Sequence, residues 1–234
     1  MAEISGTTVE HHDPPIECAV RRYLYVWEGQ IRIIHWVNFF CILILSITGY
    51  FIHNPFMSAD QHPYIMGHMR HIHYITGVVF CGGVLARILA LFVMSNRFAS
   101  WRGIPNPFSK QDRETFWAYI KFYTFLSKDT PHVIGHNPVA VVAYIFLFGL
   151  FLFQILSGFA LWAQADPNGT MYALTGWIFG ILSNQWVRWW HFMIMFLIGG
   201  FVINHIYSVI LFDFKTKSGE ISSIFSGWKP DRRD

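Results

Sequence analysis

Hydrophobic positions gather into four long blocks along the chain instead of recurring in the short periodic segments that are typical of a water-soluble core. A helix needs about 20 mainly apolar residues to cross the hydrocarbon core of a bilayer. Four stretches meet this requirement, at about 33–52, 71–94, 139–163 and 189–212. They predict an all-α integral membrane protein, with a bundle of four transmembrane helices over residues 33–212.

Two further apolar stretches do not qualify as spans. Trp177 to Leu182 is too short to cross a bilayer, and Asp112 to Leu126 mixes charged with aromatic residues. Both patterns are typical of surface or interfacial helices. The remaining parts, 1–32 and 213–234, are a polar N-terminal segment and a C-terminal tail, and no cleavable signal peptide is expected because the first thirty residues lack an apolar run.

The basic residues predict the orientation, because Lys and Arg accumulate on the cytoplasmic side of membrane proteins. Of the 17 basic residues, 14 precede the first block, lie between the second and third, or follow the fourth. The connections 53–69 and 164–187 contain none. We therefore expect both termini to be cytoplasmic and these two connections to lie outside.

Composition agrees with a lipid environment and narrows the cofactors. Hydrophobic residues make up 53% of the chain and charged residues 13%, against about 25% charged in soluble domains. The three cysteines, Cys18, Cys41 and Cys81, are too far apart for a metal-binding pair or a disulfide framework. Neither an iron–sulfur cluster nor a nucleic-acid partner is expected.

Histidines inside the predicted helices are the candidate functional residues, since ionisable groups are costly in a bilayer and usually functional. Four of the twelve histidines stand out: His35, His73, His191 and His205. His191 and His205 are 14 residues apart, which on a helix is about 21 Å of rise and a rotation of about 40°. One face of the last helix therefore carries two imidazoles at two depths.

The alternating directions of the helices pair these histidines across the bundle. His73 falls at the depth of His191 near the outer side, and His35 at the depth of His205 near the inner side. Neutral imidazole is a favoured iron ligand, so each pair can bind one b-type haem. A lone membrane histidine is more often a hydrogen-bonded packing residue, but four at matched depths favour the haem interpretation. His71, two residues before His73, would point about 200° away.

Arginines occur at regular positions relative to the candidate histidines. Arg32, Arg70 and Arg188 each precede a candidate ligand by three residues, one turn nearer the water on the same helical face. Such side chains can extend to the interface and bind haem propionates. Arg87 lies 14 residues after His73, at the depth of the inner pair, where its charge needs an anion such as an inner-haem propionate.

The segment Gly135-His136-Asn137-Pro138 precedes the third helix and has two interpretations. Asn137 can cap that helix, with Pro138 at its first position. His136 and Asn137 can also bind a quinone carbonyl close to the inner pair. The two roles are compatible.

Several motifs together resemble one family. They are Arg32-Ile33-Ile34-His35-Trp36, Thr48-Gly49-Tyr50-Phe51-Ile52, Met66-Gly67-His68-Met69-Arg70-His71-Ile72-His73, Arg87-Ile88, Gly135-His136-Asn137-Pro138, Ser157-Gly158-Phe159-Ala160, Trp190-His191 and His205-Ile206-Tyr207. The chain resembles the b-type cytochrome subunits of membrane-bound nickel–iron hydrogenases, relatives of formate dehydrogenase cytochrome subunits. The resemblance covers nearly the whole chain, and the family's four haem ligands fall on the four histidines chosen by spacing.

The resemblance implies a partner and a direction. It places the chain in the bacterial inner membrane, where it would anchor the small and large subunits of a periplasmic hydrogenase. Electrons from hydrogen would pass through outer and inner haems to menaquinone or ubiquinone, with the quinone reduced on this chain.

Two alternatives remain open at this point. The same haems could serve a formate dehydrogenase or another respiratory oxidoreductase. In a different class, the four spans and the intramembrane Arg87 are also compatible with a haem-free membrane anchor or transporter.

Overall fold

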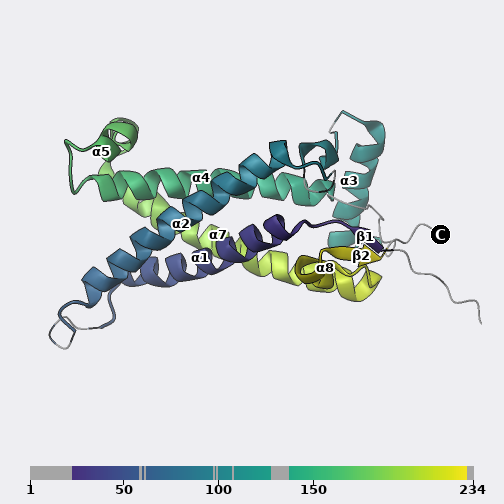
Figure 1. The fold of residues 1–234 in the computed structure, drawn as a ribbon, viewed down its shortest axis with the longest axis horizontal. Helices are drawn as coiled ribbons and strands as arrows, with labels where there is room; N and C mark the ends of the chain where they lie inside the picture. The colour runs from purple at the N-terminus through teal and green to yellow at the C-terminus, as the bar shows by residue number, and fades with distance from the viewer. Residues whose placement is uncertain are drawn as a thin grey trace, which may run out of the picture.

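The computed structural model describes residues 23–57, 60, 62–96, 98, 100–106, 108–127 and 137–230. Four long helices run along the length of the molecule (Figure 1). Each is long and apolar enough to cross a membrane, which confirms the four predicted spans and the all-α class. They are α1 Gly29–His53, α2 Ile65–Val93, α4 Pro138–Ala163 and α7 Asn184–Thr216.

Three of these helices extend beyond the predicted limits. Helix α1 begins at Gly29 instead of 33, α2 at Ile65 instead of 71, and α7 runs from Asn184 to Thr216 instead of from 189 to 212. The added turns contain polar and aromatic residues, which lower the hydropathy but continue the helical hydrogen bonding. An apolar block therefore marks the part of a helix in hydrocarbon, not the full helix.

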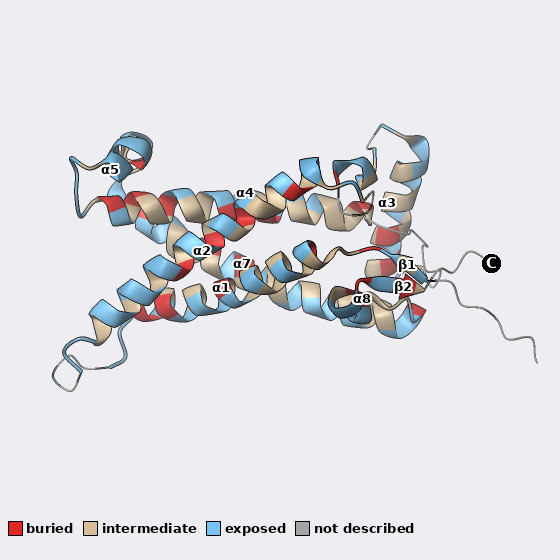
Figure 2. Cartoon of the chain, viewed as in Figure 1, coloured by how far each residue is buried: buried red, intermediate tan, exposed pale blue. Residues whose placement is uncertain are grey.

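The four helices form a bundle in which α1 packs along α2 and α4 along α7, while α2 also contacts α4 and α1 contacts α7. Its core lies near the middle of the helices, and every helix contributes to it. The core residues are Cys41, Phe80, Val84, Leu147, Phe151, Ile194 and Ile198. Many large apolar residues are exposed, and Figure 2 shows exposed positions along all four long helices, as expected of a surface that faces lipid.

Shorter helices lie at the two ends of the bundle. Helix α3, Lys110–Tyr123, confirms a helix in the mixed segment between the second and third spans. Helices α5, Thr170–Thr175, and α6, Ile178–Ile181, follow α4, and α6 is indeed too short to span. Helix α5 lies at the end of the bundle opposite to α3 (Figure 1).

The two terminal segments meet in a small structure that the hydropathy pattern did not predict. Strand β1, Tyr23–Tyr25, pairs antiparallel with β2, Trp228–Pro230. Between α7 and β2 lies α8, Glu220–Ser226, so the predicted C-terminal tail is structured up to residue 230. We call β1, α8 and β2 the terminal cap.

Several polar contacts stabilise the terminal cap, and some of them attach it to the bundle. The ammonium group of Lys229 on β2 pairs with the carboxylate of Glu220 on α8. The guanidinium of Arg32 on α1 donates to the carbonyl of Phe225 on α8. Both terminal segments therefore lie at the same end of the bundle as α3 (Figure 1).

Candidate functional site

The four predicted histidines form two pairs across the bundle. His73 of α2 and His191 of α7 have ring centroids 6.4 Å apart, with ring planes inclined by 66°. His35 of α1 and His205 of α7 have ring centroids 6.5 Å apart, with ring planes inclined by 52°. The structure thus brings together the same partners that helix spacing and direction predicted.

The spacing within each pair fits a single metal between two imidazoles. On each side of the metal, a nitrogen–metal bond of about 2.0–2.1 Å adds to a ring radius of about 1.1 Å. The centroids of two rings in line with the metal are then about 6.3 Å apart. Both observed separations, 6.4 and 6.5 Å, are close to this value. Among the described residues, no three His, Cys, Asp or Glu side chains gather to hold a bare ion. Two imidazoles suit a cofactor that brings its own equatorial ligands, as haem does.

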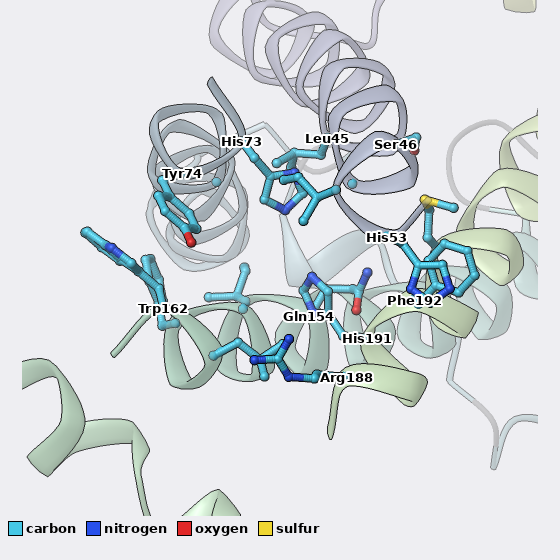
Figure 3. A pocket seen from close by; sticks show the side chains of 18 of the residues that line it. Leu45, Ser46, His53, His73, Tyr74, Gln154, Trp162, Arg188, His191 and Phe192 are labelled. Atoms are coloured by element: carbon cyan, nitrogen blue, oxygen red, sulfur yellow. The ribbon is translucent and has the colours of Figure 1, made fainter. Parts of the chain in front are cut away.

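The pair His73–His191 lies in a cavity of about 1080 Å³, slightly larger than the roughly 300–1,000 Å³ usual for ligand pockets. Figure 3 shows the two rings pointing toward each other from opposite walls. The walls come from all four long helices and are mainly apolar. A large, flat and mostly apolar group fits such a space.

The predicted arginines divide between the two ends of the bundle. Arg70 and Arg188 both line the cavity, where they add positive charge to a mainly apolar wall. Arg32 instead contacts the terminal cap, and its Nε is buried without a hydrogen-bond partner among the described residues. Arg87 has a buried Nη1 that likewise lacks a partner within the described part of the chain. A buried cation of this kind needs an anion, and haem propionates remain the predicted partners of all four.

Sequence reasoning missed two hydroxyl groups beside the histidine rings. The Oγ1 of Thr48 on α1 lies 2.9 Å from His73 Nδ1, and the Oγ of Ser157 on α4 lies 2.8 Å from His191 Nδ1. Both hydroxyl residues are buried. Each is followed by a glycine in the middle of an apolar helix, and this repeated hydroxyl–glycine pattern could have identified them.

The other histidines of the second helix and its preceding connection take different positions. His68 and His71 are exposed, so His71 does not replace His73. His53 is exposed too, yet it lines the cavity and stacks on Phe192 with ring centroids 3.7 Å apart. His53 is not among the four histidines selected from the sequence, although it lines the same cavity as His73 and His191.

The candidate quinone segment is described only in part, because His136 lies outside the described residues. Asn137 caps α4, since its Oδ1 accepts from Val139 N at 2.9 Å and from Ala140 N at 3.5 Å. Its Nδ2 donates to the hydroxyl of Tyr123 at 3.2 Å. The capping interpretation is thus confirmed, while the quinone role stays a prediction.

Tyr123 on α3 has an environment that favours its neutral form. Burial raises the pKa of the Tyr123 hydroxyl, the hydrogen bond from Asn137 lowers it, and the nearby charge of Glu220 raises it. Because burial is the largest of these effects, the phenol stays protonated over a wider pH range than a free tyrosine.

Comparison with known proteins identifies relatives that match most of the chain. The family model described as "Prokaryotic cytochrome b561" matches residues 26–227. A "Probable Ni/Fe-hydrogenase B-type cytochrome subunit" from Bradyrhizobium diazoefficiens is 35% identical over 217 residues, which cover 88% of this chain and 86% of the relative.

Two further relatives agree in length and description. The "Probable Ni/Fe-hydrogenase 1 B-type cytochrome subunit" of Escherichia coli K12 is 33% identical, with 88% of this chain and 90% of the relative covered. The corresponding protein of Rhizobium leguminosarum bv. viciae is 33% identical over 96% of this chain and 95% of its own length. With four membrane helices, two facing histidine pairs and these relatives, the chain belongs to the prokaryotic cytochrome b561 family, among the B-type cytochrome subunits of Ni/Fe hydrogenases.

Proposed function

We propose that this chain binds two b haems, one between His73 and His191 and one between His35 and His205, and that it carries electrons from a Ni/Fe hydrogenase to the membrane quinone pool. The observation that carries the proposal is the pair of ring separations, 6.4 and 6.5 Å, each matching one metal between two imidazoles. Haem supplies one-electron chemistry when bound, and the protein sets its position and potential. The chain's own part is to hold the two imidazoles of each pair opposite each other in an apolar bundle.

The distribution of basic residues supports an orientation. Basic residues concentrate in the connection that contains α3 and beyond α7, which is the end of the terminal cap. The positive-inside tendency then makes that end cytoplasmic. The cavity of His73 and His191 faces the periplasm in this orientation, so this is the outer pair and His35–His205 the inner pair. The periplasmic side is where the hydrogenase subunits would dock.

The first experiment counts haems in the purified chain. A reduced-minus-oxidised spectrum with haem quantification is expected to give two b haems per chain. His191→Ala and His205→Ala are each expected to leave one haem, because each removes one axial ligand. The matched control is His71→Ala, which removes an exposed imidazole two residues from His73 and is expected to keep both haems. A His191→Ala variant with unchanged haem content would support the haem-free anchor or transporter instead.

The second experiment identifies the partner by purification of the native complex. Ni/Fe hydrogenase small and large subunits are expected to co-purify. Formate dehydrogenase subunits in their place would support the rival respiratory complex. In the intact complex, His205→Ala is expected to abolish quinone reduction while hydrogen still reduces an artificial dye, because the inner haem is lost and the hydrogenase is not.

His136 and Asn137 are the proposed quinone ligands, and Asn137 lies at the end of the bundle where the inner pair lies. Asn137→Asp keeps an oxygen to cap α4 but removes the Nδ2 donor, whereas Asn137→Ala removes both. If the Nδ2 group binds a quinone carbonyl, Asn137→Asp keeps the thermal stability and loses quinone reduction. Equal rates of quinone reduction in Asn137→Asp and in the unaltered protein would show that Asn137 only caps α4. Tyr123→Phe, which removes the present partner of Nδ2, is the matched control.

A further inference from the structure

Each imidazole of the outer pair contacts a hydroxyl–glycine dipeptide on the neighbouring helix. Thr48-Gly49 of α1 contacts His73, and Ser157-Gly158 of α4 contacts His191, through hydroxyl to Nδ1 distances of 2.9 and 2.8 Å. A Cβ placed on either glycine would lie 3.2 Å from the Cε1 of the same ring. The hydroxyl bonds one ring atom, and the missing side chain next to it leaves room for the ring.

The hydroxyl groups determine which ring nitrogen carries the proton. Thr48 donates its hydrogen to the carbonyl of Ile44 at 2.7 Å, and Ser157 donates to the carbonyl of Phe153 at 2.6 Å. A hydroxyl has one hydrogen and two lone pairs, so each can only accept from the adjacent Nδ1–H. Both rings are therefore held as the Nδ1–H tautomer, with Nε2 unprotonated and free to bind iron.

The inner pair has different surroundings. His35 has a buried Nδ1 with no hydrogen-bond partner in the described part of the chain. The rings nearest to this pair are aromatic. Trp36 lies 5.3 Å from His35, and Phe201 and Tyr144 lie 6.0 and 6.4 Å from His205, measured between ring centroids.

We propose that Thr48-Gly49 and Ser157-Gly158 are positioning elements of the outer haem and that they hold its reduction potential below that of the inner haem. A hydrogen bond from Nδ1–H raises the basicity of a ligating imidazole, and a more basic ligand stabilises ferric iron over ferrous iron. Both outer ligands have such a bond, whereas the buried Nδ1 of His35 in the inner pair lacks one in the described structure. Transfer from the outer to the inner haem is then thermodynamically favourable. This inference rests on the proposed function, because it requires one haem at each pair.

The test is a potentiometric titration of the haem spectrum in the purified full-length chain. Thr48→Val and Ser157→Ala remove the acceptor oxygen and change little else in shape. Each is expected to raise the midpoint of the lower-potential haem and to leave the other unchanged. The expected size is a several-fold change in the ferric to ferrous ratio at fixed ambient potential, where tenfold corresponds to about 59 mV for one electron.

Two further variants separate the hydrogen bond from general packing. Thr48→Ser keeps the hydroxyl and is expected to restore the midpoint. Thr216→Val removes another buried hydroxyl, one that also donates to a carbonyl four residues earlier, at 2.7 Å, but contacts none of the paired histidines. It is expected to change neither midpoint. A His205→Ala protein, which keeps only the outer haem, assigns the lower potential to that haem.

Every outcome bears on one proposal or the other. Two haems with unchanged midpoints in Thr48→Val and Ser157→Ala, or a lower potential assigned to the inner haem, would overturn the inference and leave the proposed function intact. If Thr48→Val loses one haem, retention of that haem in Thr48→Ser supports the hydroxyl role, and its loss there overturns it. A wild-type chain without haem would refute the proposed function itself.

Discussion

Glycine in a helix interior is unfavourable by about 1 kcal/mol relative to alanine, so its position beside a functional ring calls for a physical reason. At Gly158 the reason is steric, because a Cβ there would lie 3.2 Å from His191 Cε1. The neighbouring ring would have to move by a few tenths of an ångström. Under the proposed function His191 binds haem iron, and the length of such a bond tolerates little change.

Gly158→Ala is accordingly expected to lower the occupancy of the outer haem while the inner haem is retained. Haem quantification per chain, combined with the spectrum of the remaining haem, measures this. Gly67→Ala is the matched control, because Gly67 is exposed on the same bundle and nothing lies within 4 Å of a Cβ built there. Full outer-haem occupancy in Gly158→Ala would show that the ring position is not limited by this contact.

Arg87 poses an electrostatic question at the same scale. Its buried Nη1 has no hydrogen-bond partner among the described residues, and a cation at this depth costs about 2.5–3.5 kcal/mol on insertion scales. If an inner-haem propionate balances it, the cation also stabilises the reduced haem, which carries one more electron. Arg87→Leu is then expected to lower the midpoint of the inner haem and to leave the outer one unchanged, as measured by potentiometric titration. A shift confined to the outer haem would contradict the assignment.

The pairing of the four histidines could be predicted from sequence for a geometric reason. A helix turns by about 100° per residue, so the 14-residue interval between His191 and His205 determines their common face before any packing is known. Thr48 and Ser157 could not be found in this way. Their role depends on which helix lies beside His73 and His191, and neighbour relations are set by packing of whole helices.

At the scale of elements, α3 is attached to the bundle by aromatic contacts. The rings of Tyr119 and Phe122 lie 6.2 and 6.0 Å from Phe212 near the end of α7. The Lys215 ammonium lies 5.1 Å from the centre of the Phe122 ring. Tyr123 at the end of α3 then binds Asn137 at the start of α4. Helix α3 therefore joins the two spans of the second hairpin at one end.

This connection predicts a pH dependence. The raised pKa of Tyr123 means that the folded protein binds this proton more tightly than the unfolded chain. Its contribution to stability is complete below the ordinary tyrosine pKa of about 10 and is lost as pH rises through the higher folded value. Tyr123→Phe is thus expected to lose less thermal stability than wild type between about pH 8 and pH 11. Melting temperatures measure this, with the exposed Tyr64→Phe as control, and equal losses in wild type and Tyr123→Phe would contradict it.

Elements differ in how far the sequence determines them. The four spans depend on local hydropathy and were predictable, whereas β1 and β2 are three residues each and lie at opposite ends of the chain. Their pairing of Leu24 with Lys229 is a long-range contact without a local pattern. The lengths of α1, α2 and α7 were underestimated at their polar ends, because hydropathy indicates contact with lipid and not helical hydrogen bonding.

At the scale of the whole molecule, the two ends of the bundle are chemically different. One end carries the terminal cap, α3 and most of the basic residues. The other carries α5 and the open cavity with His73 and His191. The proposed transfer of electrons from one side of the membrane to the other requires such a difference between the two ends.

The orientation itself is testable by labelling with a membrane-impermeant maleimide. Asn168 is exposed in the connection before α5, while Gln111 on α3 and Ser222 on α8 are exposed at the other end. We expect the Asn168→Cys variant to be labelled in intact spheroplasts, because its connection faces the periplasm. The Gln111→Cys and Ser222→Cys variants are expected to react only after lysis. A Cys18→Ser background removes the one native cysteine outside the membrane-spanning helices.

The three positions together test more than the location of one loop. Because β1 pairs with β2, the two strands lie on the same side of the membrane. Labelling at position 222 therefore reports the side of both. Labelling of the Gln111→Cys and Ser222→Cys variants in intact spheroplasts, with protection of the Asn168→Cys variant, would show the opposite orientation in the membrane. The cavity of His73 and His191 would then face the cytoplasm, and a periplasmic hydrogenase could not reach it. Labelling of the Asn168→Cys variant alone places the cavity on the hydrogenase side and the Asn137 region next to cytoplasmic protons, the arrangement in which quinone reduction charges the membrane.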